Sequence, residues 1–144
     1  MNKTIYVREA SLKYVGDSVA VETKNITSPE AVASLFRNVI DIDPRERFAV
    51  MHLNGRNQCT GFNIVSIGTL NASLVHPREV FHAAILASAA AIILCHNHPS
   101  GDLSPSKEDI ALTKRLCEAG KLLGIKVVDH VIVTADGFAS IMED

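Results

Sequence analysis

The sequence is poor in several features that mark specialised classes of protein. Among its 144 residues it has no tryptophan, two tyrosines and three cysteines, and the cysteines form no CxxC pair. An odd number of scattered thiols argues against a disulfide framework and a cysteine-rich zinc cluster, and is typical of a reducing compartment. The first residues, MNKTIYVREASLK, also lack the apolar core of a secretory signal. We therefore expect a cytoplasmic protein.

Charge and hydrophobic length argue against two further classes. The net charge is -2 and no basic block stands out, so we do not expect this chain alone to bind DNA strongly. The most apolar segment, residues 83–95, is too short to span a bilayer, so no membrane association is expected. The balance of 47% apolar and 21% charged residues indicates a globular chain, and its length suits one domain.

Helix and strand signals are mixed along the chain, which predicts an α/β domain with one mixed sheet and about three helices. The Asn54-Gly55 pair predicts a hairpin, and Ser28 before Pro29 predicts the start of a helix. Ser104 before Pro105 predicts another helix start. The expected elements are extended segments at 4–9 and 18–23, helices over 27–40, 76–88 and 104–123, a hairpin over 47–70, strands at 90–96 and 125–134, and a short tail after a turn at 135–137.

The stretch ILCHNHPSGDLSPSKED, residues 93–109, carries the main chemical signal. His96 and His98 alternate with one residue at the end of an apolar strand, so their side chains should point the same way. Asp109 follows in the first turns of the next helix, held near by a tight loop. Two imidazoles, one carboxylate and an open water position are a typical catalytic zinc shell.

The same residues also suit plain structural roles when taken one at a time. A histidine at a strand end is commonly a hydrogen-bonding surface residue, and Ser106 with Asp109 matches a helix capping box. The adjacent letters HNH do not make an HNH nuclease, whose motif is dispersed. The zinc deaminase signature also fails, because no glutamate follows at H-x-E and no PCxxC comes later.

The spacing resembles the JAMM metalloprotease motif, H-x-H-P followed after six residues by S-x-x-D, and residues 26–133 resemble the RadC branch of that superfamily. The resemblance implies a JAB/MPN-like (cytidine deaminase-like) domain over residues 26–144, with residues 1–25 packing on it. It further implies that His96, His98 and Asp109 are Zn²⁺ ligands. By the same resemblance, Ser106 helps to hold the oxyanion of the tetrahedral intermediate.

The resemblance also implies an upstream glutamate that acts as general base on the zinc-bound water. Glu22, Glu30, Glu46 and Glu79 are the candidates. We choose Glu46, which stands at the start of a strand where RadC-like proteins carry the matching acid. Its alternative role is a solvated charge at a strand edge, and Glu79 suits the first turn of its helix, where negative charge is favourable.

The expected activity is therefore hydrolysis of a peptide or isopeptide bond by a zinc-activated water, with a peptide or protein as substrate. An alternative is a non-catalytic or DNA-repair-associated interaction module on the same fold. Longer RadC relatives carry a helix-hairpin-helix module that binds DNA, which we do not expect in this chain. A metal-dependent nuclease is a third hypothesis, but the sequence shows no carboxylate-rich site for magnesium. Asp129 and His130 match a further RadC pair, with a role either behind a metal ligand or within the strand. The sequence indicates neither the substrate nor the oligomeric state.

Overall fold

The structure is a computed structural model, which describes residues 3–9, 25–26, 28–40, 45–68 and 75–142. Its elements are α1 (Pro29–Val39), β1 (Arg47–Leu53), β2 (Cys59–Ile67), α2 (Pro77–Leu86), β3 (Ala91–Asn97), α3 (Lys107–Leu123), β4 (Lys126–Val133) and β5 (Phe138–Ser140). The strands form one sheet in the order β2-β1-β3-β4-β5, in which only β3 and β4 run parallel. The predicted α/β domain with a mixed sheet and three helices is confirmed within this part of the chain.

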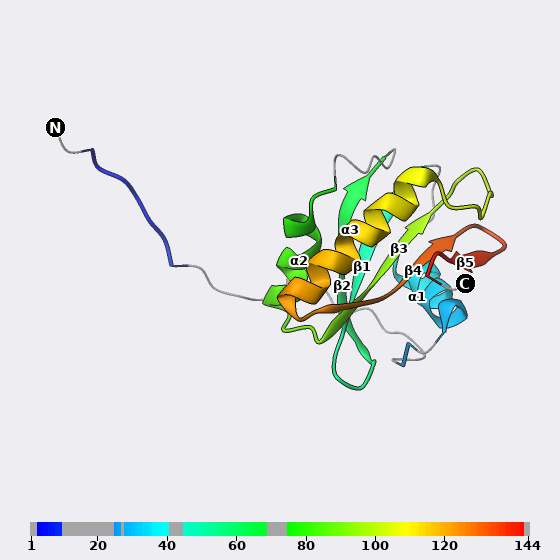
Figure 1. Ribbon diagram of the computed structural model, residues 1–144, viewed down its shortest axis with the longest axis horizontal. Coiled ribbons are helices and arrows are strands. Elements are labelled where there is room, and N and C mark those ends of the chain that lie inside the picture. The colour runs from blue at the N-terminus through cyan, green and yellow to red at the C-terminus, as the bar shows by residue number, and fades with distance from the viewer. Residues whose placement is uncertain (1–2, 10–24, 27, 41–44, 69–74, 143–144) are drawn as a thin grey trace.

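The helices lie on both faces of the sheet, which gives three layers (Figure 1). Side chains of α1 pack with alternate residues of β1, β3 and β4 in one buried cluster. Side chains of α2 and α3 pack with the intervening residues in a second cluster on the other face. Strand alternation thus separates two cores, and it decides which residues of β3 and β4 face α3.

The start of α1 follows from its sequence. The Ser28 hydroxyl accepts a hydrogen bond from the Ala31 N–H at 3.2 Å, and Pro29 occupies the first turn, where its missing N–H costs nothing. Val32 and Phe36 lie four residues apart on the buried stripe of the helix. The predicted helix start at Ser28 and Pro29 is confirmed.

The predicted hairpin is also confirmed, with a connection of residues 54–58 between β1 and β2. The Asn54 side-chain oxygen accepts hydrogen bonds from the N–H groups of Arg56 and Gln58. Asn57 has a φ of 59°, a left-handed conformation that asparagine tolerates better than most residues. The connection has five residues instead of two, and it is stabilised by the Asn54 side chain and by the left-handed backbone of Asn57.

Two boundaries near the C-terminal half differ from the prediction. The helix expected to begin at Ser104 and Pro105 begins at Lys107, with Ser106 as its N-cap. The residues expected to form a tail include β5, which pairs antiparallel with β4. No helix in the described ranges is both long enough and apolar enough to cross a membrane.

The N-terminal segment was expected to be extended and to pack on the domain. Residues 3–9 form no helix or strand and run away from the sheet (Figure 1). The exposed fractions of Ile5, Tyr6 and Val7 are 77%, 92% and 86%, so these side chains do not pack on the domain here. The second extended segment, residues 18–23, lies outside the described residues, so the assignment of residues 1–25 as a packed segment stays a prediction.

Candidate metal centre

His96, His98 and Asp109 come together at one end of the sheet, where they form a group that could hold a metal ion. His96 lies near the end of β3, His98 follows that strand, and Asp109 is in the first turn of α3. The Nε2 atoms of the two histidines are 3.0 Å apart. The Asp109 carboxylate oxygens lie 3.4 Å from His96 Nε2 and 3.4 Å from His98 Nε2. This is the only such group among the described residues.

These distances fit a small tetrahedral cation. Zinc bonds to imidazole nitrogen and carboxylate oxygen are close to 2.1 Å, so neighbouring donor atoms on a tetrahedron are about 3.4 Å apart. The two histidine–aspartate separations of 3.4 Å match that value, and the histidine–histidine separation of 3.0 Å is somewhat shorter. His96 and Asp109 are buried while His98 is partly exposed, so the group is reached from the side of His98. Three protein donors leave a fourth position open for water or substrate.

Asp109 is held by the helix start that carries it. Its Oδ2 accepts the Ser106 N–H at 2.8 Å, and the Ser106 hydroxyl accepts the Asp109 N–H at 3.0 Å, a reciprocal capping box. Burial raises the pKa of Asp109, but the adjacent His96 ring and the hydrogen bond from the Ser106 N–H outweigh it and hold that pKa well below its usual range. The carboxylate is therefore ionised and oriented.

The capping box changes one sequence interpretation. Ser104 before Pro105 was expected to begin α3, but Ser106 is the cap, in the capping box with Asp109 that the sequence also matches. The Ser104 N–H instead donates to the Asp102 carboxylate at 2.9 Å. Because Ser106 uses an oxygen lone pair as the cap, its own O–H proton stays available to another acceptor. Capping and donation to a substrate are therefore compatible.

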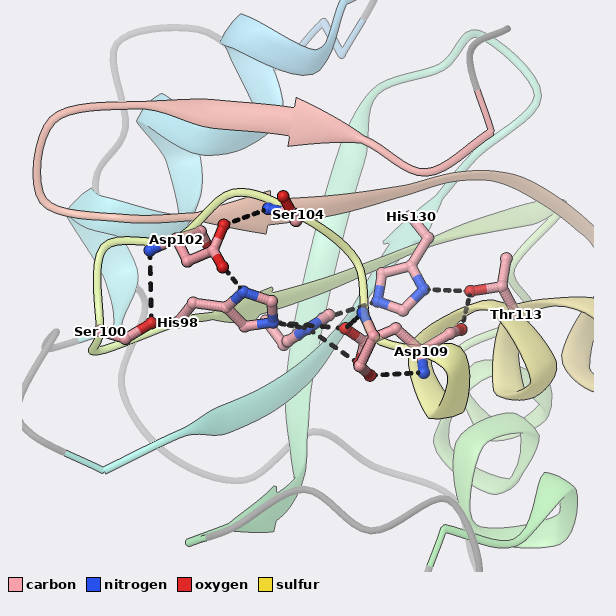
Figure 2. A network of polar contacts seen from close by, with 9 residues as sticks. His98, Ser100, Asp102, Ser104, Asp109, Thr113 and His130 are labelled. Atoms are coloured by element: carbon pink, nitrogen blue, oxygen red, sulfur yellow. Dashed lines mark hydrogen bonds and ion pairs between the residues drawn. The ribbon is translucent and has the colours of Figure 1, made fainter.

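His98 is oriented by the turn that follows it. Its Nδ1 lies 2.7 Å from the Asp102 backbone carbonyl, which can only accept, so Nδ1 carries the proton and Nε2 keeps a lone pair (Figure 2). Gly101, with a φ of 86°, allows the chain to turn back toward His98, whose carbonyl accepts the Gly101 N–H at 3.1 Å. The Pro-Ser-Gly-Asp turn therefore sets the tautomer of one candidate ligand.

His96 is oriented by a buried side chain from β4. Its Nδ1 lies 2.7 Å from His130 Nε2, and His130 Nδ1 lies 2.6 Å from the Thr113 hydroxyl. That hydroxyl donates to the Asp109 carbonyl at 2.7 Å. Burial lowers the pKa of His130 well below its usual range and the nearby His96 lowers it further, against the opposing effect of Asp109, so this imidazole is neutral. Of the two roles considered for His130, the structure favours the one behind a ligand.

A bulge in β4 brings His130 to this face of the sheet. Ile92 pairs with Val127, whereas Ile93 pairs with Asp129, so Val128 is an extra residue in the strand. Val127 faces the cluster under α3, and without the bulge Asp129 would share that face. With the bulge, the side chain of His130 lies on the face of the sheet under α3 instead.

Glu46 lies directly before β1, at the same end of the sheet as the candidate ligands. It is half-buried, and its backbone carbonyl accepts the Gly68 N–H at 2.7 Å. Two residues later, Phe48 pairs with His96, and the two rings stack with centroids 6.0 Å apart. Strand alternation gives Glu46 the parity of Phe48, and the antiparallel register, continued by two residues, puts it opposite His98. Glu46 is not one of the three grouped donors.

The remaining histidines lie apart from this group. His52 is buried in β1 and its Nε2 lies 2.8 Å from the Asn63 side-chain oxygen, so its predicted place in the strand is confirmed. His76 is the N-cap residue of α2, as expected of a helix-start residue. His82 lies within the helix predicted over residues 76–88, and its side chain is exposed on α2.

Sequence reasoning did not single out Thr113. The only available signal was its position four residues after Asp109, which puts both residues on one face of a helix. That spacing is common in helices and carries no chemistry by itself. The role of Thr113 depends on its contact with β4, which only the fold supplies.

Comparisons with known proteins agree with this architecture. The sequence matches the family described as "RadC-like JAB domain" over residues 26–144. A UPF0758 protein of Caldanaerobacter subterraneus is 54% identical over 112 residues, which cover 78% of this chain and 48% of that protein. A UPF0758 protein of Staphylococcus carnosus is 45% identical over 148 residues, covering 99% of this chain and 64% of that protein. A UPF0758 protein of Methanosarcina mazei is 46% identical over 84% of this chain and 53% of that protein. The chain thus spans about half the length of several curated relatives it matches.

Proposed function

Because the chain belongs to the RadC-like JAB domain family, we propose that it is a zinc-dependent metallopeptidase or isopeptidase that hydrolyses an amide bond in a peptide or protein. The observation that carries the proposal is the group of His96, His98 and Asp109, with separations that suit a tetrahedral cation and one open position. Since this chain aligns with only about half the length of several curated relatives, the activity of a whole relative is part of the same proposal.

Zinc suits these donors better than the hard cations do. Two imidazoles and one carboxylate match the ligands zinc prefers, whereas magnesium and calcium favour oxygen ligands throughout. When bound, zinc would acidify a coordinated water and polarise the scissile carbonyl. The reducing compartment expected from three free thiols is consistent with a cytoplasmic enzyme.

Glu46 is the proposed general base. Its carboxylate would accept a proton from the attacking water and return it to the nitrogen of the leaving amine, so that the amide bond breaks without releasing an amide anion. Support comes from its position before β1, on the face of the strand that Phe48 presents to His96. Its side chain would act beside His98, the partly exposed member of the group.

Ser106 is the proposed donor to the oxyanion of the tetrahedral intermediate. Its side chain is exposed at the start of α3, three residues before Asp109. The capping box holds the hydroxyl oxygen next to the ligand-bearing turn and leaves its proton for a substrate oxygen. One residue would then fix the carboxylate and contact the reacting group.

The proposal is tested by metal analysis followed by a peptide-library screen. Purified protein should contain about one zinc per chain and cleave at least one peptide, while Glu46→Gln should keep the metal and cleave none. DNA and ubiquitin-like conjugates are included as substrates, because the sequence names no partner. A protein with stoichiometric zinc that cleaves DNA and no peptide would replace the peptidase assignment with the nuclease reading.

A further inference from the structure

We propose that Thr113 and His130 are positioning residues, which fix His96 as the Nδ1–H tautomer and so direct its Nε2 lone pair at the metal. This inference rests on the proposed function, because it concerns the same metal site. It adds residues that touch neither metal nor substrate, and Figure 2 shows His130 and Thr113 in the line of polar contacts that includes Asp109 and His98.

The direction of each hydrogen bond in this line follows from the bond between the Thr113 hydroxyl and the Asp109 carbonyl. The Thr113 hydroxyl has one proton, which it donates to the Asp109 carbonyl at 2.7 Å. Toward His130 Nδ1, 2.6 Å away, the same oxygen can therefore only accept, so His130 Nδ1 carries a proton. The His130 ring is 0% exposed, and burial disfavours a second proton on it, so its Nε2 is bare and accepts the Nδ1 proton of His96 across 2.7 Å. His96 Nε2 is left with a free lone pair.

The opposite order would disable the site. If His130 Nε2 carried the proton, it would donate to His96 Nδ1, and the proton of His96 would move to Nε2. That proton would point at His98 Nε2, 3.0 Å away, and would occupy the position of a cation. The hydroxyl of one helical threonine thus selects between a ring that can ligate a metal and one that cannot.

Burial makes this selection strong. The exposed fractions of His96 and His130 are both 0%, and that of Thr113 is 5%, so water cannot replace a missing partner cheaply. Both ends of this line of hydrogen bonds are candidate ligands. His96 is at one end, and at the other Asp109 accepts the Thr113 hydroxyl through its carbonyl while its carboxylate belongs to the metal group. Thr113 and His130 therefore tie α3, β4 and β3 together around two of the three ligands.

The first experiment compares zinc affinities by competition with a chromophoric chelator. Thr113→Val keeps the shape of the side chain but removes both bonds of the hydroxyl, and should weaken zinc binding by about 10- to 100-fold, as loss of partners behind a metal ligand typically does. Thr113→Ser restores the hydroxyl and should lie within about threefold of wild type. Thr134→Val is the matched control, because Thr134 is also a buried threonine with hydrogen bonds, but to Gly137.

The second experiment reads the tautomers directly, by nitrogen NMR of the histidine rings in metal-free wild-type protein. We expect both His96 and His130 to carry their proton on Nδ1. Finding His130 protonated on Nε2, or folded Thr113→Val binding zinc within threefold of wild type, overturns the proposal. The NMR measurement decides the matter even if Thr113→Val does not fold. A wild-type protein that binds no zinc would contradict the proposed function instead, and the tautomers would still be measured.

Discussion

The Nε2 atoms of His96 and His98 face one another at 3.0 Å, and the Nδ1 atom of each ring lies 2.7 Å from another partner. With the proton of each ring on Nδ1, as proposed above, the two Nε2 atoms present lone pair to lone pair, which is repulsive at hydrogen-bond distance unless a cation or a proton lies between them. The Asp109 carboxylate, 3.4 Å from each, adds negative charge to the same space. The fold therefore concentrates electron pairs at one point, which favours binding of a divalent cation.

The electron pairs that His96, His98 and Asp109 bring together predict one zinc per chain and a large effect of metal on stability. Removal of zinc by a chelator should lower the melting temperature, because bound metal stabilises the folded state by mass action. His96→Ala combined with His98→Ala should abolish both the metal and the shift, whereas His82→Ala, at an exposed position on α2, should change neither. Elemental analysis with full zinc occupancy in the double variant would refute the ligand assignment.

Replacement of the proposed base should separate binding from chemistry. Glu46→Gln removes the proton acceptor without removing a member of the ligand group, so zinc content should stay near one per chain while turnover falls by about 100-fold or more. Glu79→Gln, in the first turn of α2, is the control and should retain activity. Wild-type turnover by Glu46→Gln with a loss in Glu79→Gln would show that the wrong glutamate was chosen.

Ser106→Ala should affect both stability and turnover, because the residue caps α3 and is the proposed oxyanion donor. Loss of the cap should cost about 1 kcal/mol in the free energy of unfolding, and loss of the donor should lower turnover by about 100-fold or more. Ser28→Ala removes the equivalent cap of α1 and should show only the stability loss. If Ser106→Ala cleaved as fast as wild type while melting lower, the residue would have a structural role alone.

The metal-free protein should lose stability on acidification through the titration of His130. Burial depresses its folded-state pKa below the ordinary value near 6.5, so its contribution is fully present above that pH and is lost as the pH falls below it. The loss is at most about 1.4 kcal/mol per pH unit for one proton. Free energies of unfolding, measured with urea between pH 7.5 and 5.0, should depend less steeply on pH in His130→Gln than in wild type. Some dependence on pH should remain, because burial also lowers the pKa of His52. An unchanged dependence on pH in His130→Gln would contradict this prediction.

The chain should bind duplex DNA weakly and without sequence preference. Its net charge is -2, so few phosphate contacts are available and little counterion release can drive binding. A fluorescence titration at physiological salt should give a dissociation constant of about 10 μM or weaker. Nanomolar affinity under the same conditions would favour the DNA-repair reading over the peptidase.

Much of the fold was accessible from the sequence because its signals are local and agree with one another. Ser28 with Pro29 marked the start of α1, and the Asn54-Gly55 pair marked the hairpin. The histidine spacing was informative because strand alternation fixes the direction of both rings before any tertiary contact forms. Gly124 is a local signal too, because a glycine directly after a helical pattern commonly ends a helix, and it ends α3 in a left-handed conformation with a φ of 75°.

The remaining features depend on contacts that local patterns do not specify. Two capping signals lie two residues apart before α3, and Ser106 prevails because Asp109 completes a reciprocal pair with it. β5 has three residues, too few to show a period, and exists because β4 offers it a pairing edge. The partners of His130 lie on β3 and α3, 34 and 17 residues away, so its role becomes visible only in the folded chain.

The extra residue in β4 has a consequence for how this site tolerates change. Before Val128, odd-numbered residues of β4 face α3, and after it even-numbered residues do. Asp129 and His130 are the first two residues after this change. Asp129 accepts the Ser140 hydroxyl at 2.5 Å on the face of α1, while His130 serves the opposite face. Deletion of Val128 would close the bulge and leave both residues on their present faces, because Val127, Asp129 and His130 would then alternate regularly. A one-residue slip of the register that paired Val128 with Ile93 would instead exchange the two faces, placing a carboxylate beside His96 and an imidazole in the core under α1. The site therefore depends on the register of β4 at this point more than on the presence or identity of the bulged residue.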